Sequence, residues 1–172
     1  MKDTGIKGYI QVYYGDEKGG TIAALGLSLR AAGAGFKIFI ARFNQKDGDK
    51  DMNALKRFAD LITVEQYGLG RFIHGRPLPE DTEAARKGLK RATSILSAGE
   101  HQLVVLDKAN KAVKDGLFTE QDLLNVLSAK PDHVELVITG QGAFSRIIER
   151  ADLVTEVSSI KPPMVSYGKT KR

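Results

Sequence analysis

The residues best suited to chemistry lie in a glycine-rich segment, residues 15–21, with the sequence Gly-Asp-Glu-Lys-Gly-Gly-Thr. An apolar stretch, residues 9–14, precedes it, and a helical pattern opens after it at Ile22. A loop between a strand and a helix directs backbone N–H groups and the positive end of the helix dipole at one point, which suits a phosphate chain. We therefore predict a nucleotide site, and its residues are Gly15, Asp16, Glu17, Lys18, Gly19, Gly20, Thr21 and Ile22.

The same loop lacks the cation on which such sites depend. A working phosphate loop ends in Gly-Lys-Ser/Thr, with the lysine on the terminal phosphates and the hydroxyl group on Mg²⁺. Here Gly20 stands at the lysine position, and Glu17 adds a negative charge. Losing one charge-assisted contact costs about 1.5–3 kcal/mol, so we expect ATP to bind roughly tenfold to a hundredfold more weakly than in an intact loop.

Short apolar stretches alternate with amphipathic ones along the chain. Strands rich in Val and Ile, joined by helices, are typical of a parallel sheet covered on both sides. The predicted fold is therefore α/β, a doubly wound and mainly parallel sheet. We expect strands at residues 9–14, 37–41, 62–66, 103–106, 136–139 and 153–157, and helices at 21–32, 51–58, 80–97, 120–128 and 143–150.

Ligands of open α/β sheets bind beyond the carboxyl ends of the strands. The segments that converge there in the predicted fold are residues 15–21, 43–46, 107–108 and 140–141. Asp107 ends an apolar strand, like the aspartate that helps to hold Mg²⁺ in phosphate-loop proteins. We therefore expect Thr21 and Asp107 to hold Mg²⁺.

The composition bounds the class of protein and its partners. The chain has 172 residues, of which 42% are hydrophobic and 27% are charged, and this suits a single folded domain over residues 1–172. It has no cysteine, no apolar amino-terminal run and no apolar stretch of membrane-spanning length, so we expect a cytoplasmic protein without membrane contact. The net charge of +5 comes largely from one helix face and from residues 161–172, which we expect to form a flexible tail, so nucleic acid is not the expected partner.

Several short segments carry a resemblance to a known family. They are residues 21–33, 62–68, 84–88, 97–100, 103–107, 130–134 and 138–140. In this order and spacing they resemble the ATP:corrinoid adenosyltransferases, over nearly the whole chain. The resemblance implies a P-loop NTPase fold of the RecA-like type and transfer of the 5′-deoxyadenosyl group of ATP to the cobalt of a corrinoid. The implied ligands are ATP, Mg²⁺ and a corrinoid, and the implied assembly is a homodimer or a heteromer with an active relative.

The chain departs from that family's pattern around the site. Besides Gly20 and Glu17 in the loop, the departures are Arg42 for glutamine, Lys108 for glutamate, Gln141 for arginine, and Lys161-Pro162 for Lys-His. Lys108 either reaches the phosphates from the strand side or pairs with a carboxylate, Glu17, Asp16 or Asp107, and closes an empty site. We favour a closed or weakened site.

The long loop at residues 68–79 lies where the resemblance places contacts with the corrin ring. Phe72 matches an aromatic residue of the family loop, and the resemblance gives it the role of displacing the lower ligand of cobalt. His74 either ligates cobalt, because imidazole is a good ligand for such metals, or is a surface residue. We therefore predict Phe72 and His74 as the corrinoid-facing residues.

Two interpretations of the function remain open. The first is an active corrinoid adenosyltransferase with an atypical phosphate loop. The second is a homologue that binds ATP or a corrinoid with catalysis weakened or lost, or that regulates an active relative. A partition-type ATPase is excluded, because its motif requires Gly-Lys-Thr where this chain continues as Ile-Ala-Ala after Thr21. The altered residues around the site favour lost or reduced catalysis.

Overall fold

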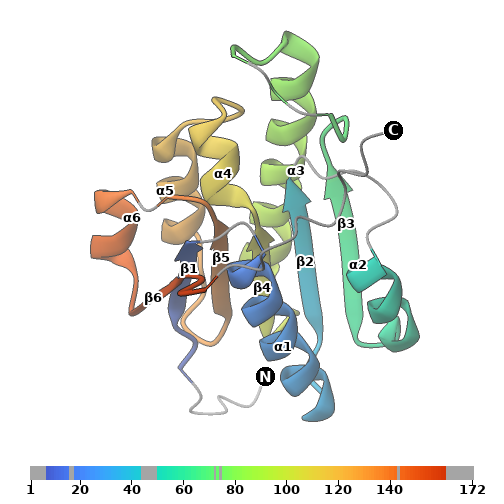
Figure 1. The fold of residues 1–172 in the computed structure, drawn as a ribbon. Helices are drawn as coiled ribbons and strands as arrows, with labels where there is room; N and C mark the ends of the chain where they lie inside the picture. Colours follow the sequence, from blue (N-terminus) through green and yellow to red (C-terminus); the bar gives the residue numbers. More distant parts are fainter. Residues whose placement is uncertain are drawn as a thin grey trace.

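The computed structural model describes residues 7–15, 18–43, 50–71, 73, 75–142 and 144–161, with the side chains of residues 50–52 left out. A sheet of six strands forms its centre, in the order β3-β2-β4-β5-β1-β6, and every neighbouring pair is parallel (Figure 1). The strands are β1 (Ile10–Gly15), β2 (Ile38–Phe43), β3 (Ile62–Tyr67), β4 (Leu103–Asp107), β5 (Glu135–Gly140) and β6 (Leu153–Val157).

Helices cover both faces of this sheet. They are α1 (Gly19–Gly33), α2 (Lys50–Leu55) with the 3-10 turn η1 (Lys56–Phe58), α3 (Pro79–Ala98), α4 (Ala109–Lys114), α5 (Glu120–Ser128) and α6 (Ser145–Arg150). One apolar cluster joins α1 and α2 to the sheet, and a larger one joins α3, α4, α5 and α6 to its other face. The predicted doubly wound α/β fold is therefore confirmed.

Residues of alternate register divide between the two clusters, which decides where each polar side chain points. Ile38, Ile40, Leu103 and Val105 pack toward α1, whereas their neighbours Phe39 and Val104 pack toward α3. Since side chains alternate along a strand, residues 42 and 107 continue the α1 face to the ends of β2 and β4. The site is therefore built on the face that α1 covers.

The predicted elements differ from the structure in two helical segments and in several ends. Each strand begins and ends within two residues of its predicted bounds. The predicted helix at 51–58 is divided into α2 and η1, and α4 was not predicted. The sequence hides α4 because the helix opens directly after β4 at Lys108, whose left-handed backbone is not signalled by a glycine.

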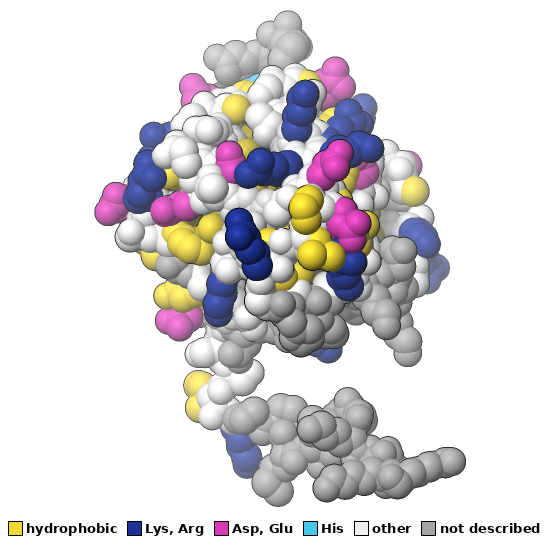
Figure 2. Space-filling view, turned by 90° about the horizontal axis from the view of Figure 1, so that it is seen from above, with side chains coloured by type: hydrophobic (Ala, Val, Ile, Leu, Met, Phe, Trp, Pro, Cys, Tyr) yellow, Lys and Arg dark blue, Asp and Glu magenta, His cyan; other side chains and the backbone are white. Residues whose placement is uncertain are grey.

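Figure 2 looks down on the carboxyl edge of the sheet. Lys and Arg side chains lie among Asp, Glu and apolar ones on this face, so the described residues seen from this side form no large patch of one charge. Among the described residues, no helix is both long and apolar enough to cross a membrane. Residues 44–46 and the tail from residue 162 onward lie outside the described residues.

Candidate functional site

One buried carboxylate, that of Asp107, organises the polar groups at the end of β4. Its Oδ1 accepts hydrogen bonds from the hydroxyl groups of Thr21 (2.6 Å) and Thr139 (2.7 Å). Its Oδ2 accepts a hydrogen bond from Nε of Arg42 (3.0 Å), and these two side chains form an ion pair. Asp107 and Arg42 are each 1% exposed. Charge-assisted bonds to a carboxylate withdrawn from water are strong, so the orientation of Asp107 is fixed.

Strand register brings these groups together. Arg42 and Asp107 are directly paired residues of β2 and β4. Thr139 lies one residue beyond the pair formed by Leu106 of β4 and Ile138 of β5, and is therefore level with Asp107. Paired residues of neighbouring strands point to the same face of a sheet. Thr21 reaches the same carboxylate from the first turn of α1, which packs on that face.

The described surroundings of Asp107 do not fit a divalent cation. The guanidinium of Arg42 already balances the charge of this carboxylate, and the next residue in the chain, Lys108, is also a cation. A divalent ion beside a buried guanidinium would be repelled by it, and this repulsion is strong where water is excluded. Among the described residues, no three His, Cys, Asp or Glu side chains form a group that could hold a metal ion. The role of Thr21 and Asp107 as metal ligands, which we expect from the sequence, stays a prediction.

Lys108 has a backbone conformation that glycine usually supplies. Its φ of 62° and ψ of 22° place it in the left-handed region, alone among the described non-glycine residues. This conformation costs about 1–2 kcal/mol, and it persists where the surroundings hold the residue in place. The N–H of Lys108 donates to Oγ1 of Thr139 (2.9 Å), and the residue is 9% exposed. Lys108 is thus buried at the strand end, while Asp16 and Glu17, two of its predicted partners, lie outside the described residues.

Glycines let the loop and the first turn of α1 pack directly on β1 and β6. Gly15 has a φ of 126°, and a Cβ there would lie 2.0 Å from the carbonyl oxygen of Val157. A Cβ on Gly19 would lie 2.4 Å from Cγ1 of Val157, and one on Gly20 would lie 2.8 Å from the carbonyl oxygen of Tyr13. The position where a lysine is expected therefore has no room for a side chain unless the backbone moves.

The first turn of α1 still offers backbone donors. The helix begins at Gly19, and its N-cap, Lys18, is exposed and makes no side-chain cap hydrogen bond. The first N–H groups of a helix have no partner within it, and with the helix dipole they favour an anion. Of the predicted nucleotide-binding residues, Gly15, Lys18, Gly19, Gly20, Thr21 and Ile22 belong to this strand-to-helix junction.

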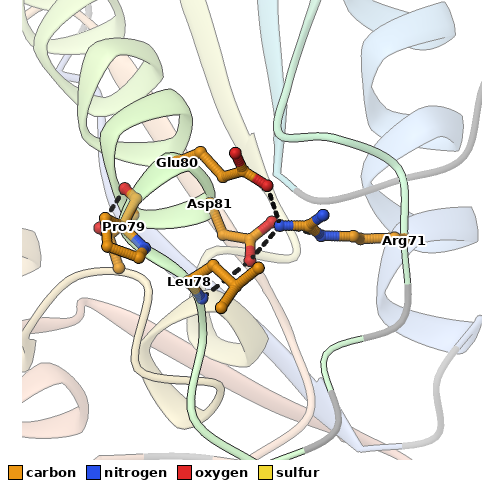
Figure 3. Close-up of polar contacts among 6 residues, drawn as sticks. Arg71, Leu78, Pro79, Glu80 and Asp81 are labelled. Carbon is orange, nitrogen blue, oxygen red and sulfur yellow. Dashed lines mark hydrogen bonds and ion pairs between the residues drawn. The ribbon is translucent and has the colours of Figure 1, made fainter.

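Arg71 ties the loop after β3 to the start of α3 (Figure 3). Its Nε donates to Oδ1 of Asp81 (2.9 Å), and its Nη2 donates to Oδ2 of Asp81 (3.0 Å) and to Oε1 of Glu80 (2.6 Å). Asp81 Oδ2 also accepts a hydrogen bond from the backbone N–H of Leu78 (3.0 Å). The bonds from Arg71, and then that from Leu78, hold the pKa of Asp81 below its usual value. Phe72 and His74, the predicted corrinoid-facing residues, belong to this loop but lie outside the described residues.

Gln141, the third predicted departure near the site, follows the end of β5 and is partly buried. The glycine before it has a φ of 140°, and a Cβ there would lie 2.7 Å from the backbone nitrogen of Lys111 in α4. This close approach explains how the short helix α4 packs against the end of β5, next to the Asp107 cluster.

Sequence reasoning missed two buried polar residues near the ends of β4 and β5. Thr139 is fully buried and bridges the Asp107 carboxylate and the Lys108 N–H. Its place before Gly140, at the end of an apolar strand, was a usable signal. Asn110 is fully buried in α4, and neither its side-chain oxygen nor its nitrogen has a hydrogen-bond partner in the described structure. Nothing in the sequence distinguishes Asn110, because α4 was not predicted.

The sequence matches a known family over most of its length. Residues 6–172 match the ATP:corrinoid adenosyltransferases BtuR/CobO/CobP. The chain belongs to this family. A corrinoid adenosyltransferase of Pseudomonas aeruginosa is 31% identical over 156 residues, which cover 90% of this chain and 77% of that protein. A corrinoid adenosyltransferase of Escherichia coli is 28% identical over 158 residues, which cover 90% of this chain and 79% of that protein. An uncharacterized protein of Nostoc sp. is 31% identical over 172 residues, which cover 92% of this chain and 46% of that protein.

The fold is shared with proteins of much lower sequence similarity. A KaiC-like protein from Pyrococcus horikoshii has a TM-score of 0.59 and 11% sequence identity, and the match covers 88% of this chain and 72% of that chain. This similarity concerns the fold alone, and it agrees with the predicted α/β class with a parallel sheet. Within the corrinoid adenosyltransferase family, this chain therefore combines the shared scaffold with an arginine and a lysine around its buried aspartate.

Proposed function

We propose that this chain is a corrinoid adenosyltransferase homologue that binds ATP, a corrinoid or both, with transfer of the adenosyl group weakened or lost. The observation that carries the proposal is the packing of Gly20, where a Cβ would lie 2.8 Å from the carbonyl oxygen of Tyr13. A lysine at this position is the usual contact of the terminal phosphates. Since the backbone occupies its space, the loss of the cation is built into the fold and is not a single exposed substitution.

The residues that remain bind and orient rather than react. Backbone N–H groups of the first turn of α1 hold the phosphates, and exposed Lys18 adds a positive charge beside them. The hydroxyl group of Thr21 is held by Asp107, which fixes its direction. Positioning and charge stabilisation of the leaving triphosphate are what a protein supplies to this transfer, and one misplaced donor costs about 10²–10³ in rate.

The family membership supports the ligand classes. Mg²⁺ is the third ligand expected from the sequence. The Asp107 cluster gives little support to Mg²⁺ binding, because Arg42 already pairs with this carboxylate. A cytoplasmic location, a homodimer and a single domain over residues 1–172 stay predictions from the sequence, as do the roles of Phe72 and His74 toward a corrinoid.

Two alternatives give different results in the same experiments. A fully active enzyme would bind ATP through backbone groups and Lys108 despite the altered loop. A regulatory partner of an active relative would bind neither ligand tightly, but would change the rate of that relative when the two are mixed. Lys108 favours the first alternative in one respect, because this cationic residue is buried and directly follows Asp107 at the end of β4.

Calorimetric titration of the purified chain with ATP, and a parallel titration with cobalamin followed by visible absorbance, test the proposal. We expect an ATP dissociation constant above about 100 μM, roughly tenfold to a hundredfold weaker than that of the Pseudomonas relative measured beside it. A dissociation constant in the low micromolar range, about −8 kcal/mol, would show that the backbone or Lys108 compensates fully and would contradict the weakened site.

A further inference from the structure

The Asp107 carboxylate has a resident cation of its own. Nε of Arg42 lies 3.0 Å from its Oδ2, and the two side chains are 1% and 2% exposed. Both residues come from neighbouring strands in direct register, so the pair forms whenever β2 and β4 pair. The contact is therefore part of the sheet and does not depend on a flexible surface side chain.

The rest of the cluster suits a carboxylate that is already neutralised. Oδ1 accepts two hydroxyl protons, from Thr21 and Thr139, while Oδ2 takes the guanidinium. A carboxylate offers about four acceptor directions, and the described contacts occupy three of them. Lys108 follows directly and is also buried. A second, divalent charge at this point would face the Arg42 guanidinium at close range.

The usual occupant of such a position is a metal ion. In phosphate-loop proteins, the loop threonine and the aspartate at the strand end help to hold Mg²⁺. We infer that Arg42 takes the place of that metal in this chain: the guanidinium neutralises Asp107 and orients Thr21, so the site neither requires nor binds Mg²⁺ at Asp107. Arg42 is then a positioning residue, because at 1% exposure it acts on a ligand through Asp107 and Thr21 and does not touch it.

Removing the guanidinium should open the carboxylate to a metal. In Arg42→Gln, Asp107 becomes a buried charge without its cation, and breaking a buried pair in this way is strongly destabilising. Mg²⁺ binding to the folded state would then recover part of the lost stability by mass action. In the wild type, Arg42 already neutralises Asp107, so Mg²⁺ has no lost stability to restore. Mg²⁺ itself is therefore a sufficient probe, and no nucleotide is needed.

The experiment compares thermal unfolding in 10 mM MgCl2 and in NaCl of equal ionic strength. The variants are wild type, Arg42→Gln, and the double variant Arg42→Gln/Asp107→Asn, which removes both charges and serves as the baseline. Arg91→Gln is the matched control for charge, because Arg91 pairs with Glu65 (3.4 Å) at an exposed position on the other face of the sheet. We expect a rise in melting temperature of about 3–6 °C that is specific to Mg²⁺ in Arg42→Gln. Wild type, Arg91→Gln and the double variant should show the same small shift as one another.

Every other outcome decides for or against the inference. A Mg²⁺-specific shift in the wild type that exceeds that of the double variant would mean that metal binds Asp107 beside Arg42. A folded Arg42→Gln protein with no more shift than the double variant would mean that Asp107 takes no metal when arginine leaves. If Arg42→Gln folds only in MgCl2, the inference is supported in a stronger form, and if it folds in neither salt, the inference is overturned.

The inference rests on the proposed function only for the position of the phosphates. Its test uses the metal alone, so a failure here leaves the ATP and cobalamin titrations untouched. Tight binding of ATP in those titrations would likewise leave the metal result standing.

Discussion

At the scale of single residues, the tight packing of Gly20 bears directly on the proposed function, because a phosphate-binding lysine is expected at this position. A Cβ at Gly20 would lie 2.8 Å from the carbonyl oxygen of Tyr13, whereas a Cβ at Gly26 in the same helix would meet nothing within 4 Å. The sequence alone suggests that a lysine at residue 20, with a glycine at residue 17, would restore the phosphate site. The structure adds a steric cost to that reversal, because the contact is with backbone.

Alanine at these two glycines separates packing from helix propensity. We expect Gly20→Ala to lower the free energy of unfolding by about 1–3 kcal/mol, because overpacking forces the backbone to shift. Gly26→Ala should raise it by about 0.5–1 kcal/mol, because alanine is the better helix former and the position is open. Urea unfolding of both variants measures the two changes. Equal effects of the two substitutions would show that α1 does not press on β1 as described.

The Asp107 cluster shows what a sequence can and cannot predict about a site. Thr21 and Asp107 were predicted together, because the loop and the strand end each have a recognisable pattern. Arg42, the ion-pair partner of Asp107, was noted only as a departure, since its contact depends on the register between β2 and β4. Register is set by packing over whole strands, and one residue of slip would turn Arg42 to the other face.

At the scale of elements, α3 begins where Arg71 and Asp81 meet. Asp81 accepts hydrogen bonds from the backbone N–H of Leu78 and from the side chain of Arg71. These two contacts join the N-terminal cap of the helix to the loop that contains Phe72 and His74. The pKa of Asp81 is lowered, first by Arg71 and then by the Leu78 N–H. A lowered pKa in the folded state stabilises the fold at any pH above the unfolded value of about 4, and this contribution is lost as the pH falls through the folded value.

Arg71→Gln should therefore destabilise the protein in a pH-dependent way. We expect the melting temperature of the variant to lie below that of wild type by a constant amount from about pH 5 to 7.5, and the gap to shrink below about pH 4 as Asp81 is protonated in both proteins. Arg76→Gln, an exposed change in the same loop, is the control and should show no such gap. A gap for Arg71→Gln that persists unchanged to pH 2 would show that the arginine acts through packing and not through the carboxylate.

The larger elements were predictable for a simple reason. Apolar strands bounded by Gly, Asp or Pro, and amphipathic helices between them, carry a pattern that can be recognised. The helix α4 was missed because its start depends on the left-handed backbone of Lys108, directly after β4. A residue other than glycine in that conformation is held by tertiary contacts, which a local pattern does not contain.

At the scale of the whole molecule, the fold keeps the features of its family and changes the charges at one edge. The six-stranded parallel sheet and the helices on both faces bring α1 to the ends of β4 and β5, as a nucleotide site requires. At that junction the chain has Gly20 in place of a lysine and a buried guanidinium on Asp107. The scaffold thus accounts for the ligand classes, and the altered charges account for the proposed loss of transfer.

Adenosyl transfer itself tests this account most directly. The measurement is the formation of the light-sensitive adenosyl product from cob(I)alamin and ATP, followed by visible absorbance, with the Pseudomonas relative assayed under the same conditions. The account predicts a rate at least about 10²-fold below that of the relative, because the leaving triphosphate lacks a positioned cation. A rate within a few fold of the relative would contradict it, and would show that backbone donors, Lys18 and Lys108 suffice for the transfer.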